Sequence, residues 1–305
     1  MFLLAHLSDP HIGPLPRPRL SDLASKRLFG YVNWRRRRSA VHRLEALDAL
    51  TRDLAGQSHD HTAVTGDLVN IALPEEFAVG QAWLDRLGAS ADVTVVPGNH
   101  DAYVRAALPY WDKHWSAFMQ GDAEAGRDPN AGRFPFVRRR GPVALIGLSS
   151  AAPTLPLSAA GRLGAEQIAR TGELLQKLDD EGLFRVVLIH HPPRRGRTSP
   201  HKRLTDAASF RRALALAGAE LVLHGHDHRR ALVWLDGPRG PIPAIGVPSA
   251  SAALDGHDEP AGYNLYRIAG RPGSWTCEVV SRGFRPGEVG IAEIGRLTLS
   301  ADGRR

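Results

Sequence analysis

Short apolar runs alternate with helix-period segments through the first 223 residues, and this alternation restricts the fold more than any other feature of the sequence. The apolar runs predict strands. Between them, apolar residues recur every three or four positions, which predicts helices. Asp206 is expected to cap one of these helices at its N-terminus. The pattern indicates an α/β protein with strands at 2–7, 62–65, 93–96, 143–148, 185–189 and 220–223 and helices at 41–54, 163–178 and 207–217.

Beyond residue 228 the helix-period segments stop. Runs at 231–235, 242–247, 263–268 and 275–280 are separated by glycine and proline, and they predict successive antiparallel strands. No internal repeat, low-complexity tract or interdomain linker divides the sequence, so we expect a single domain over residues 1–305. Residues 2–250 carry the motifs described below. Residues 250–305 are expected to complete the strands and to end in a tail that frays.

The composition is that of an ordinary globular protein, with 43% hydrophobic and 23% charged residues. No stretch approaches the ~20 consecutive apolar residues that cross a bilayer. His6 and Asp9 interrupt the apolar opening, which therefore predicts a buried first strand rather than a signal peptide. The single cysteine, Cys277, excludes an intrachain disulfide and predicts a protein of the reducing cytoplasm.

The formal charge is +7, from 39 Lys and Arg against 32 Asp and Glu, and the excess is mostly clustered arginine. This balance favours anionic partners such as phosphoesters, acidic lipid surfaces or nucleic acid. Residues 26–38, KRLFGYVNWRRRR, combine three aromatic residues with five arginines and a lysine. Such a segment suits the headgroup region of an acidic membrane or contacts with bases and phosphates. It would also suit a cap packed over an active site with its polybasic end in water.

Five short motifs hold nearly all the metal-ligating residue types of the chain, and each follows a predicted strand. Ligands of open α/β sheets bind at the carboxyl ends of the strands, so loops far apart in the sequence can meet in one crevice. The motifs are Asp9-Pro-His11, Gly66-Asp67, Gly98-Asn99-His100-Asp101, His190-His191-Pro192 and Gly225-His226-Asp227-His228.

Carboxylate, amide and imidazole ligands suit hard and borderline divalent ions. Two such ions ~3.5–4 Å apart, bridged by one aspartate, can hold both the attacking and the leaving oxygen of a displacement, and a bridging water becomes a hydroxide near neutral pH. Two ions, two aspartates and a hydroxide leave a net charge of about +1 on the site. A phosphodiester would neutralise this charge, whereas a monoester dianion would also need arginines.

The series SDPHIG, TGDLVN, PGNHD, HHPP and HGHDH, in this order, resembles the calcineurin-like metallophosphoesterase superfamily over about residues 2–250. Within that superfamily, the motif series most resembles the class III cyclic-nucleotide phosphodiesterases. The resemblance implies two packed mixed β-sheets flanked by helices, a four-layer αββα sandwich with metals at one edge. The late antiparallel strands are expected in the second sheet.

The resemblance also implies a set of ligands and roles. Two divalent ions (Mn, Fe or Zn) are expected, with Asp67 bridging them. His100 is expected to act as general acid toward the leaving oxygen and, with Asn99, to contact substrate. Asp101 is expected to shape the loop. The remaining ligands are expected to be Asp9, His11 and His228 for the first ion and Asn99, His190 and His226 for the second.

One position departs from the protein-phosphatase branch of the superfamily. That branch has an aspartate three residues after the bridging one, paired with the motif histidine, and here the position is Asn70. An amide can orient His100 but cannot stabilise its cation, which argues mildly against a protein phosphatase. Of the adjacent pair His190 and His191, only one is expected to reach a metal, and the family pattern selects His190.

Other histidines are expected in structural or solvated positions. His224 is assigned to its strand, and solvated loops are expected for His42, His59, His61, His114, His201 and His257.

Arginines follow three of the motifs and should therefore lie on the rim of the site. They are Arg17 and Arg19, Arg194, Arg195 and Arg197, and Arg229 and Arg230. We expect them either to form an electropositive collar, with Arg194 and Arg195 binding substrate, or to be ordinary solvated surface.

These features predict a binuclear metal-dependent phosphoesterase acting on a small anionic phosphoester, most directly a soluble phosphodiester such as a cyclic nucleotide. The alternative favoured by residues 26–38 is a hydrolase of a phospholipid or nucleotide-linked lipid precursor at the inner face of the membrane. A DNA nuclease is least favoured, because no further domain follows, and nucleic acid is not an expected partner. A non-catalytic protein-binding scaffold on the same fold is the alternative of another class. The oligomeric state stays open.

Overall fold

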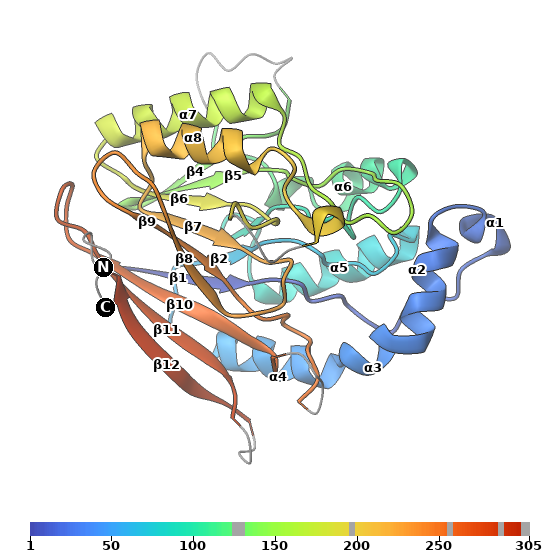
Figure 1. The fold of residues 1–305 in the computed structure, drawn as a ribbon. Coiled ribbons are helices and arrows are strands. Elements are labelled where there is room, and N and C mark those ends of the chain that lie inside the picture. The colour runs from blue at the N-terminus through green and yellow to red at the C-terminus, as the bar shows by residue number, and fades with distance from the viewer. Residues whose placement is uncertain (124–131, 195–198, 255–258, 286–289, 300–305) are drawn as a thin grey trace.

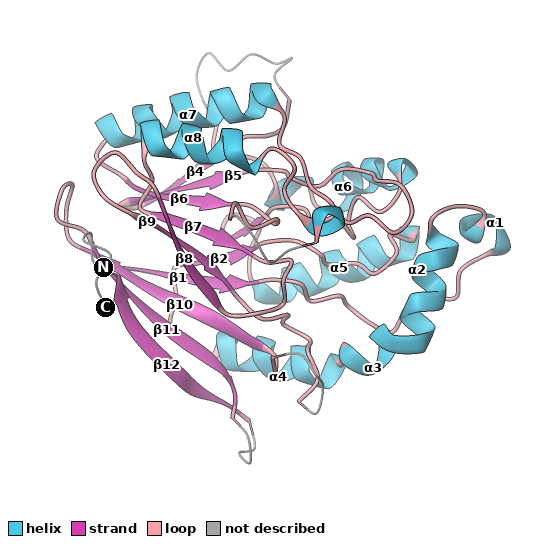
Figure 2. Cartoon of the chain, in the orientation of Figure 1, coloured by secondary structure: helices cyan, strands magenta, loops and turns pink. Residues whose placement is uncertain are grey.

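Two six-stranded sheets pack face to face between layers of helices in the computed structural model (Figure 1, Figure 2). It describes residues 1–123, 132–194, 199–254, 259–285 and 290–299. The first sheet has the order β12-β11-β10-β1-β2-β3, and the second has the order β4-β5-β6-β7-β9-β8.

The first sheet is parallel on one side of β1 and antiparallel on the other. β1 pairs with β2 in parallel and with β10 in antiparallel orientation. Its strands are β1 (Phe2–Leu7), β2 (His61–Val64), β3 (Val93–Val95), β10 (Gly262–Ala269), β11 (Thr276–Phe284) and β12 (Ile291–Leu299).

The second sheet has four parallel strands, with one antiparallel strand at each edge. β5 and β6 are buried along their whole length, as expected for parallel strands covered on both faces. The strands are β4 (Phe136–Arg140), β5 (Val143–Gly147), β6 (Phe184–Leu188), β7 (Leu221–His224), β8 (Ala231–Leu235) and β9 (Ile242–Gly246).

Three apolar layers hold the sandwich together. Leu4 of β1 packs with Leu145 and Val186 between the sheets. α4 (Leu44–Ala55) and α5 (Pro74–Leu87) pack on the outer face of the first sheet, and α7 (Ala165–Asp180) and α8 (Ala207–Ala217) pack on that of the second. Figure 1 shows these helices on opposite sides of the two sheets. The predicted four-layer α/β architecture is confirmed.

The parallel strands bring their carboxyl ends to one edge of the molecule. A cap, residues 20–41, lies at this edge (Figure 1). It consists of α1 (Leu20–Leu23), α2 (Arg27–Asn33), a π-helical turn (Trp34–Arg38) and α3 (Ser39–Val41). The short α6 (Leu108–His114) and 3-10 turns at Arg105–Ala107, Ser116–Phe118 and Pro200–Lys202 complete the helical elements of the described ranges.

Buried contacts fix the cap to the loop that follows β2. Arg27 donates hydrogen bonds to the carbonyl oxygens of Ile71 (3.2 Å) and Ala72 (2.5 Å). Tyr31 and Trp34 pack against a small apolar cluster that includes Ile71. Residues 26–38 therefore pack at the strand-end edge, as the cap interpretation predicted. Of the polybasic end that was expected in water, Arg35 and Arg36 are exposed, but Arg38 turns inward. No helix in the described ranges is long and apolar enough to cross a membrane.

The sequence predicted ten strands, and all ten are present. Two strands were missed, β4 and β12. In β4 the arginine run disguised a strand, because Arg138 is buried and its guanidinium donates to carbonyl oxygens of Ser90, Val93, Ala117 and Gln120. β12 lies where a fraying tail was expected, because pairing with β11 orders it.

Two further expectations were wrong. The late strands do not all join the second sheet: β9 lies parallel to β7 there, whereas β10, β11 and β12 extend the first sheet. Asp206 makes no side-chain cap on its own helix. Its carboxylate instead accepts hydrogen bonds from the backbone N–H groups of Leu163 and Gly164, which precede α7. Asp206 therefore ties the start of α7 to the start of α8.

Candidate metal centre

The five motif loops meet at the carboxyl-end edge of both sheets. Within the first sheet, Asp9 N–H donates to the carbonyl oxygen of Gly66 (2.9 Å). Between the sheets, His226 N–H donates to Asp9 Oδ2 (3.0 Å), and His190 Nδ1 lies 2.6 Å from the carbonyl oxygen of Thr65. The loops of the two sheets are thus joined to one another by hydrogen bonds at the site.

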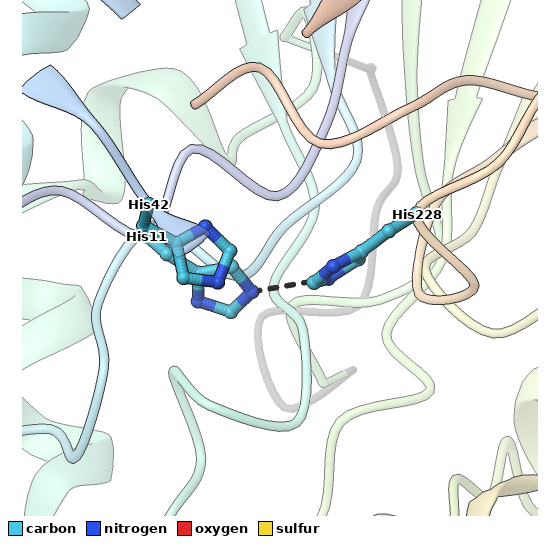
Figure 3. A group of neighbouring side chains, drawn as sticks. All are labelled: His11, His42 and His228. Atoms are coloured by element: carbon cyan, nitrogen blue, oxygen red, sulfur yellow. Dashed lines mark hydrogen bonds between the residues drawn. The ribbon is translucent and has the colours of Figure 1, made fainter. Parts of the chain in front are cut away.

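The first group of side chains contains Asp9, His11, His228 and Asp67. The Nε2 atoms of His11 and His228 are 3.2 Å apart, as the dashed line in Figure 3 marks. His228 Nε2 is 3.2 Å from Asp9 Oδ1, and His11 Nε2 is 3.7 Å from Asp67 Oδ2. These are the residues predicted to hold one ion.

The second group contains Asn99, His190 and His226, again with Asp67. His190 Nε2 lies 3.2 Å from Asn99 Oδ1, 3.3 Å from His226 Nδ1 and 3.4 Å from Asp67 Oδ2. The same oxygen of Asp67 therefore faces both groups, which is the place that the bridging role requires.

Hydrogen bonds to the backbone turn one nitrogen toward the centre in three of the four candidate histidine ligands. Nδ1 of His11 lies 3.2 Å from the carbonyl oxygen of Val69, and His190 is held at Nδ1 in the same way. His226 is held at Nε2, which is 2.7 Å from the carbonyl oxygen of Lys202. A ring that donates one N–H to a carbonyl presents a lone pair at its other nitrogen, as metal-binding histidines do.

The backbone at the motifs is in a sterically unfavourable conformation. Five of the seven candidate ligands have positive φ, between 36° and 71°, although none is glycine: Asp9, His11, Asp67, His226 and His228. Such residues cost of order 1–3 kcal/mol each and cluster at functional sites. Glycine is required beside them: a Cβ at Gly98 would lie 2.2 Å from Asp67 Oδ1, and one at Gly225 would lie 2.4 Å from Asp9 Oδ2.

The buried carboxylates create a demand for positive charge. Asp9 is fully buried and Asp67 nearly so, and Asp9 Oδ1 makes no well-aligned hydrogen bond among the described residues, although His228 Nε2 lies 3.2 Å away. Burial disfavours a charged His190, yet the Asp67 carboxylate outweighs it and raises the pKa of His190 to about 10. Burial and Arg38 hold the pKa of His11 well below its usual value, so this ring is neutral, as a ligand must be.

This donor set fits a pair of divalent cations. It offers carboxylate oxygens, one amide oxygen and imidazole nitrogens that face one another, and these atoms suit borderline ions. Asp9, His11 and Asp67 offer ligand atoms that all lie within 4.8 Å of one another, as do His190, His191 and His226. A cation in the first group would also bind Asp9 Oδ1.

The loop after β3 places the predicted catalytic residues. His100 N–H donates to Asp67 Oδ1 (2.7 Å), and its ring Nδ1 is 2.5 Å from the carbonyl oxygen of Asn70. Asn70 therefore orients His100 through its backbone, not through its amide as expected. The amide nitrogen donates to the carbonyl oxygen of Ile12 (3.0 Å) instead. Burial and Arg38 lower the pKa of His100 to about 3, so its ring is neutral in this arrangement.

Asp101 holds the two loops of the bridging aspartate together. Its carboxylate accepts hydrogen bonds from the backbone N–H groups of Asp67, Leu68 and Val69 after β2 and of Gly98 after β3. Burial and the Asp67 carboxylate raise the pKa of Asp101 to about 7, while the N–H donors favour its anion. The residue lies behind Asp67 and acts on the position of that side chain.

Of the histidines expected outside the ligand set, His61 differs from its expected place. His61 was expected in a solvated loop but is buried in β2, where Nε2 lies 2.7 Å from Thr94 Oγ1. His191 is buried and turns Nδ1 toward Ser150 Oγ (2.8 Å), while its ring packs 4.4 Å from that of His226. His224 belongs to β7, as predicted.

Two residues of the site were missed from the sequence. His42 was expected in a solvated loop, but its ring lies 4.4 Å from that of His11 and 5.6 Å from that of His228 (Figure 3). Arg38 places its guanidinium against His11 and His100. Neither residue follows a strand, and nothing in a run of four arginines indicates which one turns inward.

The predicted arginine collar is only partly visible. Arg194 contacts the Asp227 carboxylate, and Arg230 lies 3.3 Å from Glu259, so both charges are compensated. Arg195 and Arg197 lie outside the described residues, as does His257. The collar, including substrate binding by Arg194 and Arg195, stays a prediction.

Comparison with known proteins identifies similar chains. The family model described as calcineurin-like phosphoesterase matches residues 2–230. A dimetal phosphatase from Danio rerio is similar in structure, with a TM-score of 0.63 and 13% identity over 99% of each chain. Purple acid phosphatase PPD1 from yellow lupin has a TM-score of 0.58 and 11% identity over 99% of this chain and 54% of that one. Identities this low show a shared fold alone. No curated protein matches the chain significantly.

We expect Asp101→Asn to destabilise the protein and to lower its metal content. Each carboxylate oxygen accepts two N–H groups, so an amide nitrogen in either place would lose two of the four buried hydrogen bonds, at a cost of about 2–3 kcal/mol. Urea unfolding and metal analysis of the purified protein measure both effects. Asp85→Asn, at an exposed position of α5, is the control and should change neither. Unchanged stability and metal content in Asp101→Asn would contradict this role.

Proposed function

This chain belongs to the calcineurin-like phosphoesterase family and is a metal-dependent phosphoester hydrolase, and on this basis we propose that it is a binuclear phosphodiesterase. The observation that carries the proposal is the position of Asp67. One of its oxygens lies 3.7 Å from His11 Nε2 and 3.4 Å from His190 Nε2, so a single carboxylate serves two ligand groups. A site for one ion would need no such shared oxygen.

Each side chain has a distinct part in the proposed reaction. Two bound ions would supply Lewis acidity and lower the pKa of a bound water. Asp9, His11 and His228 would hold one ion, Asn99, His190 and His226 the other, and Asp67 both. His100 faces the same centre and is fixed at Nδ1 by the Asn70 carbonyl, so its Nε2 would donate to the leaving oxygen once it has taken up a proton. Asn99 would also contact the substrate.

The charge of the ion site favours a singly charged phosphoryl group. Two divalent ions, Asp9, Asp67 and a hydroxide sum to about +1, which a phosphodiester neutralises. A small soluble phosphodiester such as a cyclic nucleotide is the first substrate to test. Mn, Fe and Zn all suit the mixed oxygen and nitrogen ligands. The scaffold alternative loses support, because the whole predicted ligand set is present and converges.

We expect the enzyme with Mn²⁺ to hydrolyse bis-p-nitrophenyl phosphate faster than p-nitrophenyl phosphate, and EDTA to abolish both activities. The diester carries one negative charge, which the ion site compensates. Initial rates at saturating and subsaturating substrate give kcat and kcat/KM for each ester. Faster turnover of the monoester would contradict the diester preference. No metal-dependent turnover of either ester would support a scaffold instead.

Asp67→Ala should lose both ions, whereas His100→Ala should keep them and lose activity by about 10²–10⁴-fold, the usual contribution of a general acid. Metal analysis after gel filtration, together with circular dichroism as a folding control, separates the two effects. Equal metal content in the wild type and Asp67→Ala would refute the bridging assignment.

A second candidate, a hydrolase acting at a membrane surface, is favoured by the outer face of the cap. Leu20 is 89% exposed and Phe29 54%, and Leu28 and Val32 are exposed beside them. Lys26 ties the cap to the loop that carries the exposed Leu155 and Leu157, through hydrogen bonds to Thr154 Oγ1 (2.7 Å) and the Ser158 carbonyl (2.9 Å). Exposed Arg35 and Arg36 add positive charge nearby.

Such a surface suits acidic lipid, because apolar side chains enter the acyl boundary and arginines attract the headgroups. It would place the enzyme at the inner face of the membrane, the location that the sequence suggested. A phosphoester lipid or a nucleotide-linked lipid precursor would then be the substrate.

The wild-type protein should sediment with vesicles that contain acidic lipid, and Phe29→Glu should reduce the bound fraction of protein several-fold. The substitution places a negative charge where a negative surface would approach. Leu216→Glu is the matched control, because Leu216 is 78% exposed on α8, away from the cap (Figure 1). Equal binding of Phe29→Glu and the wild type to acidic vesicles would exclude a lipid contact through this face. Equal binding of the wild type to neutral and acidic vesicles would exclude the proposed contact with acidic lipid.

A further inference from the structure

The cap delivers one arginine into the metal centre. Nη1 of Arg38 lies 2.7 Å from His100 Nε2, and Nη2 lies 2.9 Å from His11 Nε2. The other nitrogens of these rings face backbone carbonyls, so both Nε2 atoms accept hydrogen bonds from the guanidinium. Arg38 therefore lies between a candidate ligand of the first ion and the residue placed for the leaving oxygen.

The fold fixes the backbone on both sides of Arg38. Upstream, Arg27 and Trp34 bind the cap to the loop after β2. Downstream, Ala253 N–H donates to the carbonyl oxygen of Val41 and Arg43 N–H to that of Ser251, each at 2.7 Å. Arg38 ends a π-helical turn, an element that recurs at functional sites. The guanidinium is thus presented by an anchored element rather than by a free surface side chain.

Arg38 also differs from the other arginines near the motifs in its charge balance. Arg194 and Arg230 each pair with a carboxylate. No carboxylate of the described residues lies within ion-pair distance of Arg38, and its contacts are neutral rings. Asp67 and Asp9 act on it electrostatically from beyond that distance, and bound ions would compensate these carboxylates, so the charge of Arg38 would then be available to an anionic oxygen.

We propose that Arg38 binds a second negative charge of the substrate, beyond the single charge of a simple phosphodiester. This inference rests on the proposed binuclear site: with ions, aspartates and hydroxide at about +1, Arg38 brings the total to about +2. A simple diester would leave half of that charge uncompensated. The second anionic oxygen can belong to a neighbouring phosphate, as in a pyrophosphate linkage, or to the same phosphorus, as in a monoester.

The contact with His11 explains how the guanidinium becomes available. Nη2 donates to the lone pair that a cation would use, so ion binding competes with this hydrogen bond. The freed N–H groups of Arg38 can then bind a substrate oxygen beside His100. A guanidinium suits this task, since its planar donors match two phosphate oxygens at once.

The test compares Arg38→Gln with the wild type on substrates of different charge. The singly charged probe is bis-p-nitrophenyl phosphate, and the doubly charged probes are p-nitrophenyl phosphate and UDP-glucose, a pyrophosphate diester. Calorimetry of the Mn²⁺-loaded protein with inorganic phosphate and dimethyl phosphate measures the same difference without turnover. Arg36→Gln is the matched control, an exposed arginine of the same π-helical turn.

Arg38→Gln should lower kcat/KM for whichever doubly charged probe is a substrate by about 10–100-fold, and that for the singly charged diester by less than about threefold. Phosphate affinity should fall by a similar factor, dimethyl phosphate affinity should not, and Arg38→Lys should recover part of the loss. Mn²⁺ affinity should be unchanged or higher. Arg36→Gln should match the wild type.

Equal losses on all probes, or none, would overturn the proposal, as would weaker Mn²⁺ binding, which would make Arg38 a support of the ion site. If Arg38→Gln does not fold, the same comparison with Arg38→Lys decides: a phosphate affinity equal to that of the wild type overturns the proposal. The diester proposal is judged separately, from the ranking of the two nitrophenyl esters by the wild type. The pyrophosphate and monoester sources are told apart by which doubly charged probe responds.

Discussion

Two buried carboxylates, Asp9 and Asp67, determine which groups must surround them in the rest of the site. A carboxylate away from water must be compensated by positive charge or by hydrogen-bond donors. Among the described residues, Asp67 receives a single backbone N–H, at Oδ1, and its other oxygen faces two imidazoles. The raised pKa of His190 and the guanidinium of Arg38 beside His11 follow from the same unmet demand. Divalent cations would compensate these buried carboxylates more directly than protonated side chains do.

The cap connects two properties that the sequence presented as alternatives. Its inner side reaches the metal centre through Arg38, and its outer side exposes Phe29 and the neighbouring leucines. Segment 26–38 therefore need not be either a cap or a surface contact. A single element can hold a charged headgroup on one side and face an apolar environment on the other, which is the geometry that a phosphoester carried by a lipid would require.

The sequence was informative where a strand ends in a motif. All seven proposed ligands follow β1, β2, β3, β6 or β7, and parallel pairing brings such ends together. It was uninformative where tertiary contacts decide the outcome. Arg138 and Arg38 both stand in arginine runs, yet one is satisfied by carbonyl oxygens inside the fold and the other enters the site. His42 was missed for the same reason, because its position depends on Ser251, more than two hundred residues away. The local sequence pattern also could not show that β10 pairs in the first sheet rather than in the second.

The last motif contributes to both proposed ligand groups, through His226 to one and His228 to the other. A nascent chain can therefore complete one group only after residue 226, and the other only after residue 228, has left the ribosome. β1 also waits for residues 262–269 before its second edge is paired. During synthesis Asp9 and Asp67 are made well before His226 and His228. Binding of the ions would therefore be one of the last events of folding and would not nucleate it.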